Sequence, residues 1–241
     1  MSHHQPVLLT EVVNALVTIP QGFYIDATVG QGGHTRAILS RLEHPGGILA
    51  MDRDPEAIAF IKQTVKPKQT ALGSPGLYIY PARFDQWGTV LHQMALDPCR
   101  QVSGILLDLG ISSAQLANPE RGFSFMQAGP LDMRMNPESG ETAAHWLKQV
   151  SLPVLTQVLQ TYGEERFAGR IARAIVQTRR HRPIVTTDQL ADVVQQVKPR
   201  RTGRKHPATQ TFQAIRILIN DELNLLSKGL QQALVFLKPR G

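Results

Sequence analysis

The feature that most constrains the fold is a short apolar run that leads through three closely spaced glycines into an amphipathic segment. The run is Phe23-Tyr24-Ile25-Asp26, and the glycines are at positions 30, 32 and 33. Aromatic and β-branched residues in a short run favour a buried strand, and the apolar spacing in 35–42 favours a helix. A strand, a glycine turn and a helix form the first unit of a nucleotide-binding α/β sheet. Because glycines let a ligand approach the backbone, we expect a cofactor site at this turn, with Asp26 facing it.

The residues around the turn restrict the type of cofactor. A dinucleotide fingerprint requires a glycine where this chain has Thr35, and a P-loop requires Gly-Lys-Ser/Thr where it has His34-Thr35. A second predicted strand over 47–52 ends in Asp52, 22 positions after Gly30, where such folds place a carboxylate on a ribose diol. An adenosine ligand without a pyrophosphate indicates S-adenosylmethionine. The alternative, a tight turn followed by a surface acid, stays open.

The rest of the chain repeats this unit and then changes character. Two further strands are predicted at 77–80 and 102–108, so four βα repeats indicate an α/β fold with a doubly wound parallel sheet. A loop-rich stretch and then helical patterns follow, with helices expected over 152–162, 164–178, 187–197, 209–220 and 222–237. We therefore expect a discontinuous cofactor-binding core, 1–115 and 207–241, interrupted by an inserted all-helical domain, 116–206. No strand follows 237–241, which leaves the fourth strand as an edge, so C-terminal strands of a longer chain are expected to be missing.

Composition limits the class of protein. The 241 residues are 42% hydrophobic, and a single cysteine, Cys99, excludes an internal disulfide and fits a reducing compartment. No Cys/His cluster has zinc spacing, so no metal is expected. Neither a signal peptide nor an apolar run of roughly 18 residues is present, so a soluble cytoplasmic protein without a membrane partner is expected. The net charge of +7 favours an anionic partner.

The positions of the positive charges favour RNA as that partner. Arg166, Arg170 and Arg173 share one face of a predicted helix, and a basic run over 198–205 contains Arg200, Arg201 and Arg204. These side chains would neutralise phosphates and give salt-dependent affinity. For the helix face alone, an ordinary solvated surface is a slightly better interpretation.

Several sequence blocks together resemble one known family, the bacterial small-subunit ribosomal RNA methyltransferase H family. The resemblance runs from His4 to Gly241 and rests on blocks at 4–12, 26–34, 51–55, 108–116, 121–125, 129–135, 162–165 and 206–216. It implies a Rossmann-like class I methyltransferase that uses S-adenosyl-L-methionine to methylate the exocyclic N4 of a cytidine in the decoding region of 16S ribosomal RNA. The substrate would be this RNA or the assembled small subunit, bound by the inserted domain. A homodimer is compatible with the sequence.

The resemblance also implies which residues bind the cofactor. Gly32, Gly33 and His34 match the loop at the methionine end, and Asp52 matches the ribose acid. The remaining matches are Phe84 and Asp108 on the adenine side and one further contact, Gln115. With Gly30 from the turn, these residues make up the expected cofactor site.

The chemistry of methyl transfer to an amino group requires an acceptor for its proton, because the lone pair of this nitrogen is delocalised into the ring. The candidates after the fourth strand are the Asp108 carboxylate, the Ser112 and Ser113 hydroxyls, and a backbone carbonyl of the same turn. The target base must also leave its stack. Phe123, Phe125 and Arg134 are candidates for the walls of its pocket, and packing of the two phenylalanines in the core is an equal alternative.

Two other functions are compatible with parts of the sequence. A nicotinamide-dependent dehydrogenase would share the fold, but the missing third glycine opposes it. A non-catalytic RNA-binding protein could retain a methyltransferase fold without turnover. Binding of S-adenosylmethionine or NAD, and a methyl-transfer assay, would separate the three.

Overall fold

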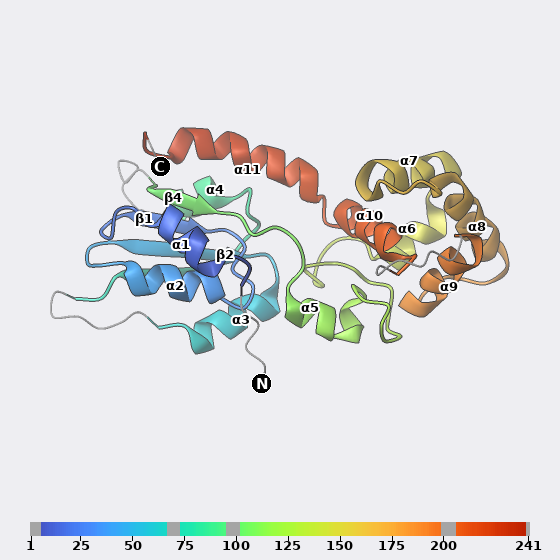
Figure 1. Cartoon of the computed structure of the whole chain (residues 1–241), viewed down its shortest axis with the longest axis horizontal. Coiled ribbons are helices and arrows are strands. Elements are labelled where there is room, and N and C mark those ends of the chain that lie inside the picture. The colour runs from blue at the N-terminus through green and yellow to red at the C-terminus, as the bar shows by residue number, and fades with distance from the viewer. Residues whose placement is uncertain (1–5, 67–72, 95–101, 199–205, 240–241) are drawn as a thin grey trace. The chain divides into compact units, whose positions relative to one another are not determined.

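A computed structural model of the chain describes residues 6–66, 73–94, 102–198 and 206–239. The chain forms two compact units (Figure 1). The first comprises Met1–Ser112 and Asn224–Gly241, and the second comprises Ser113–Leu223. Each unit has its own core and is described separately below.

The first unit is built on a parallel sheet of four strands, β1 (Phe23–Asp26), β2 (Gly47–Asp52), β3 (Gly76–Pro81) and β4 (Gly104–Leu106). The strand order is β3-β2-β1-β4, and every neighbouring pair is parallel (Figure 1). This confirms the predicted doubly wound sheet. The order of the strands reverses at β1, which places β4 next to it, and ligands of such sheets bind at the carboxyl ends of the strands at this point.

Helices cover both faces of the sheet. On one face α1 (Leu9–Leu16), α2 (Gly33–Arg41) and α3 (Pro55–Thr64) pack against a shared apolar cluster with Tyr24 and Ile48. On the other face α4 (Trp87–Gln93) and α11 (Glu222–Phe236) enclose a second cluster (Figure 1). Because both faces are covered, the strands are buried on both sides, as their nearly continuous apolar sequences predict.

The outer edge of β4, which the sequence suggested would be unpaired, is paired at one residue just before the strand begins. Val102 forms a parallel bridge with Leu237 directly after α11. Its N–H donates to the Phe236 carbonyl at 3.0 Å, and its own carbonyl accepts from Lys238 N–H at 3.0 Å. The segment after α11 therefore covers this edge at Val102.

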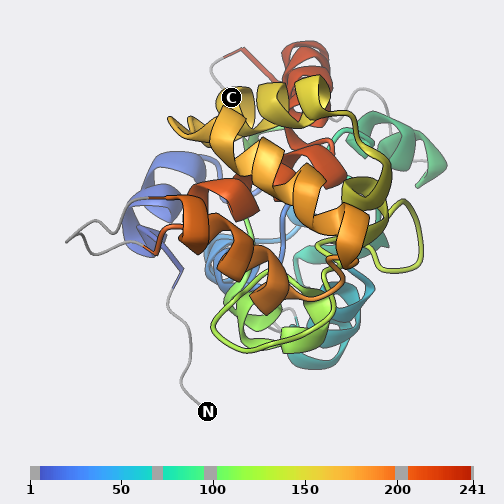
Figure 2. The same cartoon turned by 90° about the vertical axis from the view of Figure 1, so that its right-hand side faces the viewer.

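The second unit is helical. It contains α5 (Ser113–Ala117), a 3₁₀ turn (Pro119–Arg121), α6 (Ala143–Gln149), α7 (Leu152–Gly163), α8 (Ala168–His181), α9 (Thr187–Val197) and α10 (Thr209–Ile219). Consecutive helices α7, α8 and α9 pack on each other, and α10 packs on α7 (Figure 2). Leu155, Ile171 and Leu190 are fully buried between them. A separate core of this size is typical of a unit that forms its own domain.

The boundary between the units differs from the one expected from the sequence. Residues 113–115 and 207–223, assigned above to the cofactor-binding core, lie in the helical unit. The reason is the close approach of α10 to α7: a Cβ at Gly163 would lie 2.6 Å from the Gln210 carbonyl oxygen. Only a glycine allows the two backbones to pack so tightly, and the contact ties α10 to the helical unit.

The described residues offer neither a membrane span nor a metal cluster. No helix among them is both long enough and apolar enough to cross a membrane. Within the same residues, no group of three or more His, Cys, Asp or Glu side chains could hold a metal ion.

Candidate cofactor-binding site

The glycine turn between β1 and α2 forms one side of the candidate site. Gly30 and Gly32 have positive φ angles of 49° and 72°, which glycine adopts without strain. The Gly30 N–H donates to Asp52 Oδ2 at 2.9 Å, so the turn is fixed to the end of the neighbouring strand β2. The structure thus brings together the turn and the acid that the spacing predicted.

The three glycines have different surroundings. A Cβ at Gly32 would lie 2.1 Å from Ile61 Cδ1 in α3, and one at Gly33 would lie 2.1 Å from Pro6 Cγ. A Cβ at Gly30 would meet only Ser112 Cβ, at 3.9 Å. Two of the glycines thus have a packing role, and contact of a ligand with the backbone of all three stays a prediction. Gly32 and Gly33 permit close packing within the protein, and Gly30 alone of the three faces open space.

Asp52 is held by two backbone donors at the end of β2. In addition to the bond from Gly30, its Oδ1 accepts from Asp54 N–H at 2.9 Å. Burial raises the pKa of the Asp52 carboxyl to about 6, and the two backbone hydrogen bonds only partly offset this effect. The carboxylate is therefore oriented toward the glycine turn and can still accept hydrogen bonds from a bound diol through its remaining lone pairs.

Asp26, at the end of β1, stabilises the turn through hydrogen bonds to its side chain. Its Oδ2 accepts from the Thr35 hydroxyl at 2.6 Å and its Oδ1 from Thr28 N–H at 3.2 Å. Burial raises the pKa of Asp26, although the hydrogen bond from Thr35 opposes this rise. Both carboxylate oxygens thus bind protein groups, and Asp26 fixes the start of α2, whereas the sequence had suggested that it faces the ligand.

His34 connects three segments at the other end of the site. Its Nε2 lies 3.3 Å from the Val7 carbonyl oxygen, and its Nδ1 lies 3.7 Å from Asp108 Oδ2. The Asp108 N–H in turn donates to the Thr28 hydroxyl at 2.7 Å. His34 is nearly buried, whereas half of the Asp108 side chain is exposed. The structure therefore places Asp108 at the surface beside the turn, where a ligand can reach it.

The two other cofactor candidates are both buried. Phe84, three residues after β3, belongs to the apolar cluster beneath α4 and α11, and a Cβ at Gly229 of α11 would touch its ring at 3.5 Å. Gln115 lies in α5 of the second unit. The position of Phe84 near the carboxyl ends of the strands fits the adenine side of the site, and most of its ring packs against the protein.

The candidate proton acceptors lie on both sides of the unit boundary. Asp108 and Ser112 belong to the first unit, where Ser112 is the side chain nearest to the open face of Gly30. Ser113 begins α5 of the second unit. Within the first unit, Asp108 and Ser112 therefore flank the glycine turn on the β4 side.

The three side chains suggested as walls of a base pocket make contacts within the second unit. Phe123 is buried, with the Arg121 guanidinium 5.8 Å from its ring centroid. Phe125 lies 4.8 Å from the Phe212 ring in an edge-on arrangement and 4.4 Å from the His206 ring. These are contacts of packed residues, and they favour the packing alternative for both phenylalanines.

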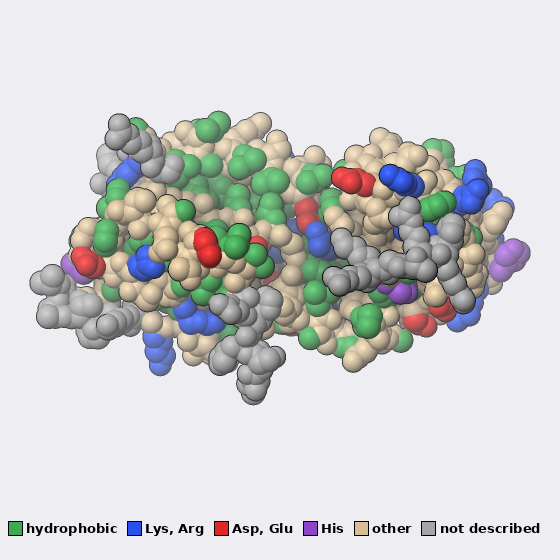
Figure 3. Space-filling model, in the orientation of Figure 1, with side chains coloured by type: hydrophobic (Ala, Val, Ile, Leu, Met, Phe, Trp, Pro, Cys, Tyr) green, Lys and Arg blue, Asp and Glu red, His purple; other side chains and the backbone are tan. Residues whose placement is uncertain are grey.

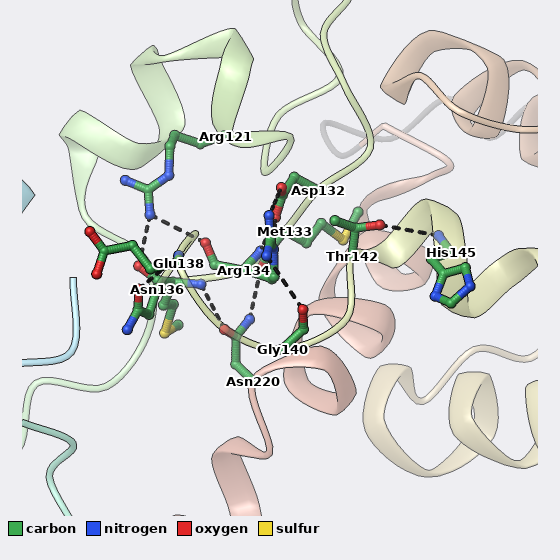
Figure 4. Close-up of polar contacts among 11 residues, drawn as sticks. Arg121, Asp132, Met133, Arg134, Asn136, Glu138, Gly140, Thr142, His145 and Asn220 are labelled. Atoms are coloured by element: carbon green, nitrogen blue, oxygen red, sulfur yellow. Dashed lines mark hydrogen bonds and ion pairs between the residues drawn. The ribbon is translucent and has the colours of Figure 1, made fainter. Parts of the chain in front are cut away.

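Arg134, the third of these side chains, forms a paired ion bridge with Asp132, at 2.8 Å for Nε–Oδ1 and 2.7 Å for Nη2–Oδ2 (Figure 4). Burial alone would raise the pKa of Asp132, but the hydrogen bonds from Arg134 outweigh it and lower this pKa. The loop around Arg134 is held by Asn220, whose Oδ1 accepts from Met135 N–H and whose Nδ2 donates to the Met133 carbonyl. Arg134 therefore has a structural partner already.

The basic residues separate into exposed and structural ones. Arg166, Arg170 and Arg173 are exposed, as are Arg180 and Arg182 after them, and Figure 3 shows Lys and Arg side chains on the visible face of the second unit. Arg200, Arg201 and Arg204 lie outside the described residues.

Lys198, the first residue of the predicted basic run, has a different role. Its side chain is nearly buried, and its Nζ binds Glu165 Oε2 at 2.5 Å and the Pro207 carbonyl at 2.9 Å. Its ammonium group is neutralised inside the protein and does not contribute to the exposed charge. The sequence of the basic run does not indicate that one of its lysines is buried.

Sequence reasoning also missed residues that shape the site through the backbone. Pro6 and Val7 lie against Gly33 and His34, and Asn220 holds the loop before α6. The Val7 contact uses a main-chain carbonyl, which no sequence motif identifies. For Asn220, its place at the end of a predicted helix was the available signal, because asparagine is common there.

Comparison with known proteins places these features in context. The model of the MraW methylase family matches residues 1–241. A ribosomal RNA small subunit methyltransferase H of Idiomarina loihiensis is 50% identical over 238 residues, which cover 99% of this chain and 73% of the relative. The protein of the same name from Methylococcus capsulatus is 50% identical over 234 residues, covering 97% of this chain and 75% of the relative.

Proposed function

We infer that this chain, which belongs to the MraW methylase family, is an S-adenosylmethionine-dependent methyltransferase that acts on the RNA of the small ribosomal subunit. We propose the exocyclic N4 of a cytidine in the decoding region as the methyl acceptor. The proposal rests on the family, on the relatives named for this activity, and on a site that fits the cofactor.

The observation that supports the cofactor most directly is the arrangement of Gly30 and Asp52. A carboxylate fixed by the Gly30 and Asp54 N–H groups stands at the end of β2, and among the described residues a Cβ at Gly30 would meet only Ser112 Cβ, at 3.9 Å. These features suit a ribose diol on Asp52 and a ligand that passes over the turn. Gly30, His34, Asp52 and Asp108 would hold the group, with Phe84 on the adenine side.

The bound cofactor supplies an electrophilic methyl group, so the main task of the chain is to place the attacking nitrogen in line with it. Two groups beside the turn are placed to accept the amino proton, the exposed Asp108 carboxylate and the Ser112 hydroxyl. Substitution of the true acceptor lowers kcat and leaves the Kd for S-adenosylmethionine unchanged. An Asp108→Asn variant that weakens cofactor binding would assign Asp108 to the cofactor and leave the Ser112 and Ser113 hydroxyls and the backbone carbonyl as candidate acceptors.

The decisive experiment combines calorimetry and methyl transfer. The chain should bind S-adenosylmethionine and not NAD, and it should transfer labelled methyl groups to small ribosomal subunits that lack this modification. Naked 16S ribosomal RNA, tested in parallel, distinguishes free RNA from the assembled subunit as substrate. Binding without transfer would favour the non-catalytic RNA-binding alternative, and binding of NAD alone would contradict the methyltransferase.

We propose that the exposed arginines of the second unit bind RNA phosphates in the cytoplasm, where the ribosomal subunits are. Replacement of Arg166, Arg170 and Arg173 by Gln should reduce the slope of log K against log salt by about 0.7–0.9 for each phosphate that is no longer neutralised. The same change at Arg200, Arg201 and Arg204 tests the predicted basic run, and Lys228→Gln in α11 is the control. An unchanged slope would exclude the phosphate role of the residues replaced.

A further inference from the structure

One residue in a strained backbone conformation lies beside the candidate site. Four non-glycine residues of the described chain have positive φ angles, namely Leu8, Met133, Glu164 and Asp221. A bulky side chain in this region is unusual and costs free energy. Such strain persists where the surrounding structure enforces it, which is frequent at functional sites.

The other three residues have ordinary reasons for this conformation. Met133 is fully buried, and Asn220 holds its carbonyl at 2.7 Å. Glu164 directly follows α7, and Asp221 lies two residues after the end of α10, where a left-handed residue commonly ends a helix. Leu8 instead directly precedes α1 as its N-cap with φ 50°, and 63% of it is exposed. Neither burial nor a helix C-terminus accounts for its conformation.

The surroundings of Leu8 connect it to the cofactor turn. We call Pro6–Leu8 the N-terminal strap. Pro6 packs on Gly33, the Val7 carbonyl lies 3.3 Å from His34 Nε2, and the helix that follows, α1, packs on α2. The strap is therefore held on both sides of Leu8, and it presents two adjacent apolar side chains, Val7 and Leu8, which are 66% and 63% exposed.

The strap lies at the end of the site opposite Asp52. His34, to which it is bound, contacts Asp108 just beyond β4, whereas Asp52 ends β2, and β1 lies between these strands. On the proposed function, the ribose lies at Asp52 and the adenine lies toward Phe84, which follows β3, so the β4 side is left for the methyl-donating end. Asp108 then lies at the methyl-donating end and not on the adenine side that the resemblance implied. The nucleotide that receives the methyl group must approach on that side.

We propose that Val7 and Leu8 contact the target nucleotide of the RNA, with Leu8 as a specificity-determining residue whose strained turn holds the apolar pair toward the base. This inference rests on the proposed function. An apolar pair fixed to the backbone provides a surface for the face of a pyrimidine, and the left-handed turn sets its direction. The strain is then maintained for binding and not for folding.

The test exploits the opposite effects that the proposal predicts for stability and substrate binding. Leu8→Asn introduces a residue that tolerates the left-handed conformation, and Leu8→Gly removes the strain altogether. Both variants should unfold at a higher urea concentration than the wild type. Their KM for undermethylated small ribosomal subunits should rise about tenfold, as expected when one apolar group is removed from a binding surface, with an unchanged Kd for S-adenosylmethionine. Leu230→Asn, at an exposed leucine within α11, is the matched control and should leave KM unchanged.

The outcomes separate the inference from the proposed function. Stabilised Leu8 variants with an unchanged KM would overturn the contact with the nucleotide while leaving the methyltransferase intact. A higher Kd for S-adenosylmethionine with an unchanged KM would also overturn it, because the strap would then act on the cofactor. A wild-type chain that binds no S-adenosylmethionine would instead overturn the proposed function, and the inference with it.

Discussion

At the scale of single residues, the properties of the site follow from which hydrogen-bond donors each carboxylate binds. Asp26 uses both oxygens on Thr35 and Thr28, whereas each oxygen of Asp52 accepts one backbone N–H and keeps a lone pair for a ligand. The two acids end neighbouring strands of one sheet, yet one is structural and the other is available. Hydrogen-bond partners, not residue type, make this distinction.

We expect cofactor affinity to depend on the ionisation of Asp52. Its pKa is raised to about 6 by burial, and the carboxylate accepts hydroxyl groups better than the protonated acid. The Kd for S-adenosylmethionine should therefore be lowest above pH 6 and rise by up to about tenfold for each pH unit below it. Calorimetry between pH 5 and 8 measures this dependence.

Asp52→Ala provides the reference for this pH series. It should weaken binding at pH 7.5 by about 10- to 100-fold, the effect of removing a charge-assisted hydrogen bond, and it should flatten the part of the pH dependence that Asp52 causes. A variant that retains the full pH dependence would show that another group titrates.

The same raised pKa makes the stability of the free protein depend on pH. Between the ordinary value of 3.8 and about 6, the folded chain binds the Asp52 proton and the unfolded chain has released it. The contribution of Asp52 to the free energy of unfolding therefore decreases as the pH rises through this window, and Asp26, whose pKa is also raised, acts in the same direction. Urea titrations of wild type and Asp52→Ala at pH 4.5 and 7 should show this as a difference between the two proteins.

Asn220 is the residue for which we expect the largest loss of stability in the second unit. It is buried, and it binds Met135 N–H and the carbonyls of Met133 and Arg216 at 2.7–2.9 Å. Asn220→Ala removes the side-chain partner of the Met135 N–H and the Met133 carbonyl, so it should lower the free energy of unfolding by about 2–4 kcal/mol. Asn136→Ala, which removes one exposed hydrogen bond to Glu138 N–H, should cost less than about 1 kcal/mol. Equal effects in urea denaturation would contradict the role of the Asn220 bonds.

At the scale of secondary-structure elements, close approaches decide where glycine is required. Gly32→Ala places a methyl group within the space of Ile61 at a positive φ, whereas Gly229 in the middle of α11 has its nearest neighbours at 3.5 Å and no positive φ. We therefore expect Gly32→Ala to destabilise the fold by about 1–3 kcal/mol. Gly229→Ala should stabilise it by about 0.5–1 kcal/mol, because alanine favours a helix. Thermal unfolding of both variants tests this contrast, and it fails if Gly229→Ala is the more harmful change.

Element boundaries depended on local contacts that the apolar pattern does not reveal. The helix predicted over 164–178 begins at Ala168, because Glu164 adopts a left-handed conformation and the Glu165 side chain accepts from Phe167 N–H. Helix α6, which the sequence analysis did not predict, spans only seven residues, and the Thr142 side chain caps it. Short helices and polar turns depend on such side-chain contacts more than on periodicity.

At the scale of the whole molecule, the two units differ in net charge and in how the chain forms them. The second unit holds 15 Lys and Arg against 10 Asp and Glu, which accounts for five of the seven net positive charges. It is also one continuous segment, whereas the first unit is formed by two. An inserted, basic helical unit of this kind suits a role in binding RNA while the sheet binds the cofactor.

The continuity of the second unit predicts that it folds alone. Residues 113–223 enclose their own core, with Leu147, Leu155 and Ile171 fully buried. The isolated fragment should show a helical circular dichroism spectrum and a single cooperative thermal transition. Asn220→Ala within the fragment is the control and should lower its Tm by several degrees. A fragment without a cooperative transition would show that the helical unit requires the sheet.

Much of the fold was predictable because it follows local rules. Asp54 caps α3 by accepting from Glu56 N–H, with Pro55 at its first position, as their sequence suggests. The strands β1 and β2 have the predicted bounds because their apolar runs end sharply at an acid. The unit to which α10 belongs and the burial of Lys198 were not predictable, because they depend on partners distant in the sequence, Gly163 and Glu165.

The sequence by itself determined the parallel sheet, the glycine turn, the acid at the end of β2 and the excess of positive charge, because each arises from residue spacing or composition. Only the tertiary structure decided that Asp26 is structural, that Lys198 is neutralised and that the N-terminal strap lies beside His34. The physical reason is that hydrogen bonds and ion pairs over long sequence separations depend on how the elements pack. No local pattern of residues contains that information.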